Sequence, residues 1–251
     1  MISGRRARAV SLTALSATVL VLLAGCAAEP VTAPTASPPF VPAQLAATPS
    51  PAPPSPSPAP SSSAEPSERV VTLGDSVMSG FGLSAREAWP RLLAQRTHVS
   101  LVNLACPGMG FVVAGDCGTP YAGLVPAVAA LQPDLVIVES SSNDLWQDAD
   151  EIRFETADTV ERLHEAAPDA LIVGLSTIWN DDPDVPDDIA VTSDALRDAV
   201  QAVGGTYIDV GQPLVGHPEW LQSDDVHPTA GGQRAVEHAV ASALQETAVL
   251  P

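Results

Sequence analysis

Five short apolar runs in this chain alternate with five longer segments whose apolar residues recur every three or four positions. Short β-branched and aliphatic runs predict strands, and the longer spacing predicts amphipathic helices. The predicted strands are 70–73, 99–104, 135–139, 171–176 and 206–210, and the predicted helices are 86–96, 122–131, 150–166, 193–203 and 229–247. Ser84 and Glu87 have capping-box spacing before the first helix. Such alternation predicts an α/β fold, a three-layer α/β/α sandwich with a five-stranded parallel sheet.

The first residues have the pattern of a processing signal. Arg5, Arg6 and Arg8 precede an apolar run, 10–23, that is too short for an ordinary membrane-spanning helix. The tetrapeptide Leu23-Ala24-Gly25-Cys26 resembles the lipobox of bacterial lipoproteins, in which the cysteine becomes the lipid-bearing first residue. We therefore expect a signal peptide over 1–25 and a membrane anchor on Cys26. An ordinary secretory signal is the alternative.

Proline, alanine and serine dominate the segment that follows. Thirteen of the 25 prolines lie between residues 27 and 67. Such a composition buries too little apolar surface to fold, and it favours an extended spacer. The predicted organisation is therefore a disordered linker over 26–68 and one folded domain over 69–251.

The charge of the chain excludes one class of partner. The chain has no lysine, and three of its eleven arginines precede Cys26, which leaves eight arginines against thirty acidic residues, a formal charge of −22. Phosphate recognition needs clustered cations. Nucleic acid and anionic lipid surfaces are therefore not expected as binding targets.

Polar residues follow the predicted strands at the point where each one ends. Ser76 follows the first strand, Gly108 the second and Asn143 the third, while Asp224 and His227 lie between the fifth strand and the last helix. Right-handed crossovers bring the carboxyl ends of parallel strands to one edge of the sheet, where ligands bind. The five residues are therefore expected to converge.

These residue types suit nucleophilic catalysis on an ester. A serine hydroxyl needs an imidazole to take its proton, and a carboxylate must orient that imidazole. His227 and Asp224 can serve as base and orienter for Ser76. The backbone N–H groups of Ser76 and Gly108 and the amide of Asn143 can stabilise an oxyanion. This interpretation requires neither a cofactor nor a metal.

The same residues carry a family resemblance. The motifs Gly74-Asp75-Ser76, Gly108, Asn143-Asp144 and Asp224-x-x-His227 resemble, in order, the four blocks of the SGNH or GDSL hydrolases. The segments 80–82 and 88–90 are most similar to the arylesterase and lysophospholipase branch. The resemblance extends from residue 69 to about 244, and it implies a flavodoxin-like sheet and the catalytic and oxyanion roles given above. Ser141 and Ala105 stand where the family usually has glycine, which puts the shape of those loops in question.

Several residues have other interpretations. His227 could cap the last helix, Asp225 could replace Asp224, and the two carboxylates with the imidazole could bind a metal. The acidic run 181–188 is expected to be a solvated loop, with a calcium site or a lid as alternatives. The remaining histidines are expected at the surface, and the four tryptophans (Trp89, Trp146, Trp179 and Trp220) have no assigned role.

Two cysteines remain if Cys26 is lipidated. Cys106 and Cys117 flank the segment that contains Gly108. In an exported protein such a pair forms a disulfide, which here would fix the loop that carries Gly108. Two buried thiols are the alternative.

Together these patterns predict an exported serine esterase or lipase on the outer face of a bacterial cell membrane. It would act on small-molecule, lipid or glycan esters, and we expect a monomer. An acyltransferase that uses the same residues and a non-catalytic wall-binding lipoprotein are the alternatives.

Overall fold

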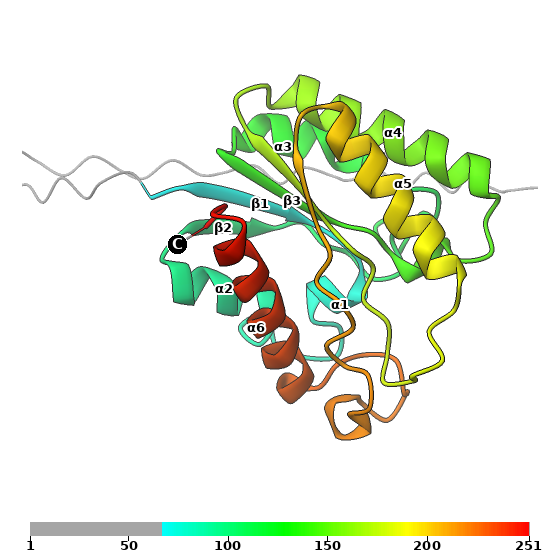
Figure 1. The fold of residues 1–251 in the computed structure, drawn as a ribbon. Coiled ribbons are helices and arrows are strands. Elements are labelled where there is room, and N and C mark those ends of the chain that lie inside the picture. The colour runs from blue at the N-terminus through cyan, green and yellow to red at the C-terminus, as the bar shows by residue number, and fades with distance from the viewer. Residues whose placement is uncertain (1–66, 251) are drawn as a thin grey trace, which may run out of the picture. The chain divides into compact units, whose positions relative to one another are not determined.

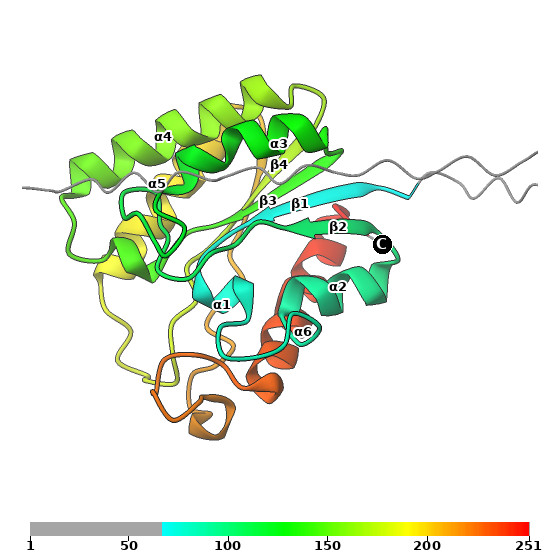
Figure 2. The same cartoon turned by 180° about the vertical axis from the view of Figure 1, so that it is seen from behind.

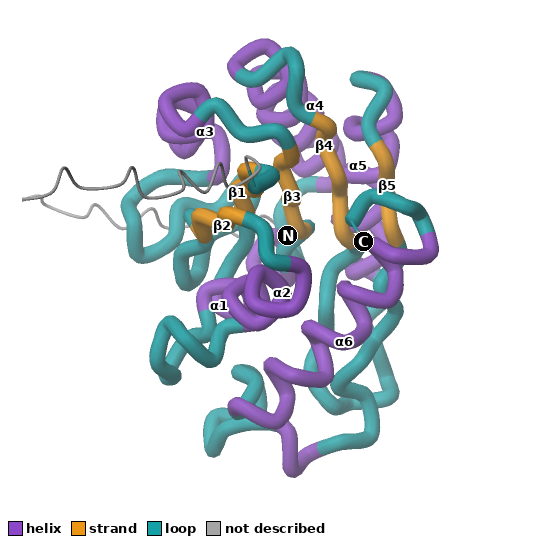
Figure 3. The backbone as a smooth tube through the Cα atoms, turned by 90° about the vertical axis from the view of Figure 1, so that its left-hand side faces the viewer, coloured by secondary structure: helices purple, strands orange, loops and turns teal. Residues whose placement is uncertain are grey.

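The computed structural model describes residues 67–250. The predicted signal peptide 1–25, Cys26 and the linker up to residue 66 lie outside this range. Five parallel strands form one sheet in the order β2-β1-β3-β4-β5 (Figure 3). Their bounds are Arg69–Leu73 (β1), Ser100–Asn103 (β2), Leu135–Glu139 (β3), Leu171–Leu175 (β4) and Thr206–Ile208 (β5). This is the flavodoxin-like doubly wound order, and it confirms the predicted fold class.

Helices cover both faces of the sheet. Helices α3, α4 and α5 lie on one face, and α2 and α6 lie on the other (Figures 1 and 2). Their bounds are Trp89–Thr97 (α2), Val125–Leu131 (α3), Ala149–Ala166 (α4), Asp188–Ala202 (α5) and Ala230–Glu246 (α6), and a short helix α1 spans Ser76–Ser79. None of the helices within 67–250 has the length and hydropathy needed to cross a membrane.

The alternation of side chains along the strands divides the core into two layers. Val71 and Val136 point to the face that is covered by Val160 of α4 and Leu196 of α5. The neighbouring residues of the same strands pack against α2 and α6 on the opposite face. All five residues of β3 are buried, as expected for a central strand with helices on both sides.

The first long helix begins three residues later than the sequence predicts. Ser84 and Glu87 do interact, and the Ser84 hydroxyl donates to Glu87 Oε2 at 2.7 Å. This contact lies in a turn, however, and α2 begins at Trp89. A helix from Arg86 would place Pro90 in its interior, where Pro90 has no N–H for the carbonyl of Arg86. In the first turn of α2 the missing N–H costs nothing.

Other boundaries also differ from the prediction. Helix α5 begins at Asp188 instead of residue 193, so the acidic run ends inside a first helical turn, where a carboxylate favours the positive end of the helix dipole. The predicted helix 122–131 divides into a 3₁₀ turn, Tyr121–Leu124, and α3. The short helix α1 was not predicted. The remaining helix and strand ends lie within two residues of the prediction.

The parallel sheet places the loops 74–88, 104–120, 140–148, 176–187 and 209–229 after the carboxyl ends of its strands. These loops carry the residues that the sequence predicts for catalysis, which are Ser76, Gly108, Asn143, Asp224 and His227. The fold therefore provides the single edge on which the predicted site depends.

Candidate active site

Ser76 is the first residue of helix α1, three residues after strand β1 ends at Leu73. The side chain of Asp75 caps this helix by accepting the N–H of Val77 at 2.9 Å. Gly80 ends the helix with a left-handed φ of 72°, a conformation that glycine adopts without strain. The tight strand-turn-helix connection therefore fixes Ser76 at the carboxyl edge of the sheet, where the residue is only 9% exposed.

A cavity of about 320 Å³ opens at this edge. Its lining includes four of the predicted site residues, which are Ser76, Gly108, Asn143 and His227. The four come from four different loops, so their convergence is a property of the fold rather than of local sequence. Asp224 is the fifth predicted residue. It does not line the cavity, but it forms a hydrogen bond with His227.

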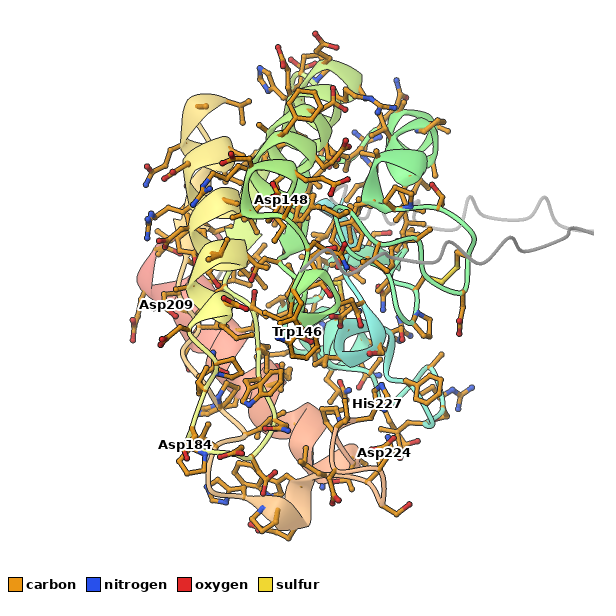
Figure 4. The ribbon with its side chains drawn as sticks, turned by 90° about the vertical axis from the view of Figure 1, so that its right-hand side faces the viewer. Trp146, Asp148, Asp184, Asp209, Asp224 and His227 are labelled. Atoms are coloured by element: carbon orange, nitrogen blue, oxygen red, sulfur yellow. A yellow bond between two sulfur atoms is a disulfide. The ribbon has the colours of Figure 1, made fainter. Side chains whose placement is uncertain are left out.

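His227 is oriented by Asp224 through a short hydrogen bond. The distance between His227 Nδ1 and Asp224 Oδ2 is 2.7 Å, and Figure 4 shows the two side chains next to each other. Asp224 Oδ1 also accepts the backbone N–H groups of Val226 and His227, at 3.1 and 3.0 Å. The hydrogen bond from His227, followed by these backbone bonds, lowers the pKa of Asp224 to about 2. The carboxylate is therefore ionised at neutral pH, and it leaves His227 Nε2 as the ring nitrogen that can accept a proton.

The loop that carries His227 is held by contacts within the loop and by contacts with the loop of Ser76. Leu221 and Pro228 form an isolated antiparallel bridge. The side-chain amide of Gln222 donates to the carbonyl of Phe81 at 2.7 Å. The ring of Phe81 packs on that of His227, with 4.4 Å between their centroids. The imidazole is thus held between Asp224 and an aromatic ring that follows the serine.

The serine and the imidazole face the same cavity without a direct hydrogen bond. Among the contacts within residues 67–250, none joins the Ser76 hydroxyl to His227. Catalytic hydrogen bonds are often long in a free enzyme and shorten when substrate binds. The structure therefore shows Ser76 and His227 on one cavity, without a hydrogen bond between them.

Two backbone donors of the cavity are unused. In the part of the chain that the structure describes, the N–H groups of Ser76 and Gly108 donate to no protein acceptor. Gly108 has a left-handed φ of 73°, which disfavours any residue with a Cβ. Unpaired N–H groups beside a serine hydroxyl are what a developing oxyanion requires.

The loop that carries Gly108 is held by a disulfide and by hydrogen bonds to a buried carboxylate. A disulfide joins Cys106 and Cys117, whose Cα atoms are 6.3 Å apart, and the sequence predicted this pair. The buried carboxylate of Asp144 accepts three successive backbone N–H groups, from Phe111 at 2.6 Å, Val112 at 3.1 Å and Val113 at 3.0 Å. Burial raises the pKa of Asp144, and the three N–H donors partly oppose that rise. Asp144 therefore ties the Gly108 loop to the loop of Asn143.

Asn143 belongs to a small network of buried polar groups. Its amide nitrogen lies 3.1 Å from the carbonyl of Met109 and 3.0 Å from Ser141 Oγ. Ser141 Oγ in turn donates to Asp75 Oδ2 at 2.5 Å. Asp75, the residue before Ser76, and Ser141, two residues before Asn143, are thus joined by a hydrogen bond. Family reasoning did not predict this link, because glycine is usual at position 141.

The rest of the cavity wall is largely apolar, and the sequence did not predict it. Side chains of this wall are Val77, Phe81, Pro107, Ile178, Trp179 and Val226, and Asp116 is an acidic residue among them. Among residues 67–250 no arginine reaches the lining. Trp179 follows the end of β4, and this position could have indicated that its side chain lines the cavity. The other wall residues carry no sequence signal, because they come from four separate loops.

The alternatives for the site residues can be compared with the geometry. Asp224, and not Asp225, is the hydrogen-bond partner of His227, while Asp225 is exposed with a φ of 57°. Within 67–250 no group of three or more histidine, cysteine, aspartate or glutamate side chains is arranged to hold a metal ion. Most residues of the run 181–188 are exposed. His98, His164, His217 and His238 lie outside the cavity.

Comparisons with known proteins agree with this architecture. The chain is 27% identical over 189 residues to a GDSL lipase of Mycobacterium tuberculosis, which covers 68% of this chain and 79% of the lipase. It is 25% identical over 197 residues to thioesterase 1/protease 1/lysophospholipase L1 of Escherichia coli strain K12. This match covers 72% of this chain and 86% of that protein.

A solved structure shares the fold. It is a salicylyl-acyltransferase from a tetracycline biosynthetic pathway, with a TM-score of 0.61 and 18% sequence identity, over 74% of this chain and 56% of that chain. The sequence model of the GDSL-like lipase/acylhydrolase family matches residues 72–235, a range that contains Ser76, Gly108, Asn143, Asp224 and His227. The chain belongs to the GDSL-like lipase/acylhydrolase family.

Proposed function

We propose that this protein is an exported, lipid-anchored serine esterase that cleaves carboxylic esters through an acyl-enzyme intermediate. The observation that supports this best is the common cavity of Ser76, Gly108, Asn143 and His227, with the imidazole already hydrogen-bonded to Asp224. Membership in a family of lipases and acylhydrolases supports the same reaction class.

In the proposed reaction Ser76 is the nucleophile and His227 the general base. His227 Nε2 takes the hydroxyl proton as Ser76 Oγ attacks the ester carbonyl carbon. The carbonyl oxygen becomes an oxyanion, which the N–H groups of Ser76 and Gly108 and the amide of Asn143 stabilise. Collapse of this intermediate expels the alcohol, which receives the proton from His227. Water, activated by the same imidazole, then releases the carboxylic acid and restores the serine.

The membrane anchor is a separate part of the proposal. The sequence Leu23-Ala24-Gly25-Cys26 supports lipidation of Cys26 after signal cleavage. Two or three acyl chains on one cysteine would hold a protein stably at a bilayer, since each buried methylene contributes about 0.8 kcal/mol. The proline-rich segment that follows would separate the enzyme domain from the membrane surface on its outer face.

Ester turnover by the wild type, Ser76→Ala and His227→Ala tests the proposal. A series of p-nitrophenyl esters with increasing acyl length serves as substrate. We expect measurable kcat/KM for the wild type and a loss of at least about 10³-fold in both variants. The matched control is Ser84→Ala, an exposed serine outside the cavity. Equal, negligible turnover by wild type and Ser76→Ala would favour a non-catalytic wall-binding protein.

Acyl transfer is the second candidate, because the chain shares its fold with a salicylyl-acyltransferase. Both reactions use the same residues up to the acyl-enzyme. Turnover in the presence of an added alcohol separates them. A dominant ester product at low alcohol concentration would favour transfer, and a dominant free acid would favour hydrolysis.

A further inference from the structure

Ser141 carries a buried hydroxyl that contacts a residue of the site and that no step of the proposed reaction uses. Its side chain is 0% exposed and caps the 3₁₀ turn Ser142–Asp144. The hydroxyl donates to Asp75 Oδ2 at 2.5 Å. The same oxygen accepts from the backbone N–H of Asn143 and from its side-chain Nδ2, each at 3.0 Å. Ser141 therefore links the residue beside the nucleophile to a proposed oxyanion donor.

Asp75 needs the donor that Ser141 supplies. Its carboxylate is buried, with 3% of the residue exposed, and an unpartnered buried carboxylate oxygen is unfavourable. Oδ1 accepts the N–H of Val77 at 2.9 Å, and Oδ2 accepts the Ser141 hydroxyl. The next donor near Oδ2 is Asn143 Nδ2, at 3.5 Å. If position 141 lacked a hydroxyl, the amide of Asn143 would be the nearest replacement.

We propose that Ser141 is a positioning residue for the oxyanion site, because its hydroxyl satisfies Asp75 and so keeps the Asn143 amide on Ser141 Oγ, a partner that it can exchange for the substrate oxygen. The inference rests on the proposed esterase function. As the oxyanion forms, one Asn143 amide N–H transfers from Ser141 Oγ to the substrate oxygen. Ser141 keeps the backbone N–H of Asn143 and its own bond to Asp75, so no buried group loses its last partner.

Kinetics of Ser141→Ala, Asn143→Ala and the double variant test this coupling. We expect Ser141→Ala to lower kcat roughly tenfold and to leave KM within about twofold, because the loss falls on the transition state. Asn143→Ala should lower kcat about 10²- to 10³-fold, the usual cost of one oxyanion donor. In the Asn143→Ala background the Ser141 change should have no further effect, since it acts through that amide. Multiplied losses in the double variant would overturn the proposal.

Ser140→Ala is the matched control for this experiment. Ser140 is adjacent, 1% exposed, and its hydroxyl bonds to that of Thr177 at 2.5 Å instead of to the site. We expect it to leave kcat unchanged within about twofold even if it lowers stability. If Ser141→Ala does not fold, Ser141→Gly removes the same hydroxyl.

The crystal structure of Ser141→Ala gives a second readout that does not depend on activity. We expect Asn143 Nδ2 to move from 3.5 Å to hydrogen-bonding distance of Asp75 Oδ2. An unmoved amide would overturn the proposal, whatever the kinetics show. An inert wild type would contradict the esterase function, while the position of the amide in the variant would still decide the role of Ser141.

Discussion

The substitution Asp144→Asn tests how the Gly108 loop is held. The wild-type carboxylate accepts three backbone N–H groups, from residues 111, 112 and 113. One oxygen of an asparagine can still serve two of them, but its NH₂ group then faces the third. Losing a hydrogen bond to a charged acceptor costs about 1.5–3 kcal/mol, and the two that remain weaken by about 1 kcal/mol each because the acceptor becomes neutral.

A smaller desolvation cost offsets part of this loss of hydrogen-bond energy. Burial raises the pKa of Asp144, which means that the ionised carboxylate carries a desolvation cost that asparagine avoids. We therefore expect the free energy of unfolding to fall by about 2–3 kcal/mol at pH 8, well within the 5–15 kcal/mol of a typical domain. The variant should fold, and the Gly108 loop should be its least stable part.

Urea unfolding and ester kinetics measure the two consequences. We expect a lower unfolding midpoint and a loss of at least about tenfold in kcat, because the Gly108 N–H no longer has a fixed direction. The same substitution at Asp169, an exposed residue between α4 and β4, should change stability by less than about 0.5 kcal/mol. Wild-type stability together with wild-type kcat in Asp144→Asn would refute the reasoning.

Three further predictions concern groups around the site. Cys117→Ser removes a disulfide that closes a short loop; urea unfolding should report a loss of about 3 kcal/mol, and an unchanged midpoint would contradict a structural role. Burial raises the pKa of Glu139 well above 4.5. The folded state therefore holds the Glu139 proton more tightly than the unfolded state, and the free energy of unfolding falls as pH rises from 4.5 through the raised pKa. Glu139→Gln should therefore flatten the stability–pH curve above pH 4.5 by up to about 1.4 kcal/mol per pH unit, and an unchanged slope would be inconsistent with this. Asp116 lies in a cavity wall that no arginine of residues 67–250 lines. Asp116→Asn should raise kcat/KM for a hemisuccinate ester by about threefold and leave that for a neutral butyrate ester unchanged. Equal effects on the two esters would contradict this prediction.

The part of the fold that follows from periodicity was predictable. The inner strands β1, β3 and β4 are predictable because a buried parallel strand is apolar on both faces. The edge strands β2 and β5 are more exposed. The helix starts were less predictable, because they depend on single residues. Pro90 moved the start of α2 past the Ser84 and Glu87 pair, and Asp188 extended α5 into a run whose composition is typical of a loop.

The residues of the site divide in the same way. Asp224 and His227 are three positions apart on one loop, so their contact could be predicted from spacing. The hydrogen bond between Ser141 and Asp75 joins residues 66 positions apart, and no local pattern indicates it. The apolar wall is built from side chains of separate loops, whose relative positions only the folded sheet determines.

Covalent labelling of the intact protein tests the central claim most directly. A fluorophosphonate reacts with a serine only where a base activates the hydroxyl and donors stabilise the adduct. The account predicts one adduct in the wild type, located on Ser76 by peptide mapping, and none in Ser76→Ala. Absence of any adduct in folded wild type, or an adduct that persists in Ser76→Ala, would contradict it.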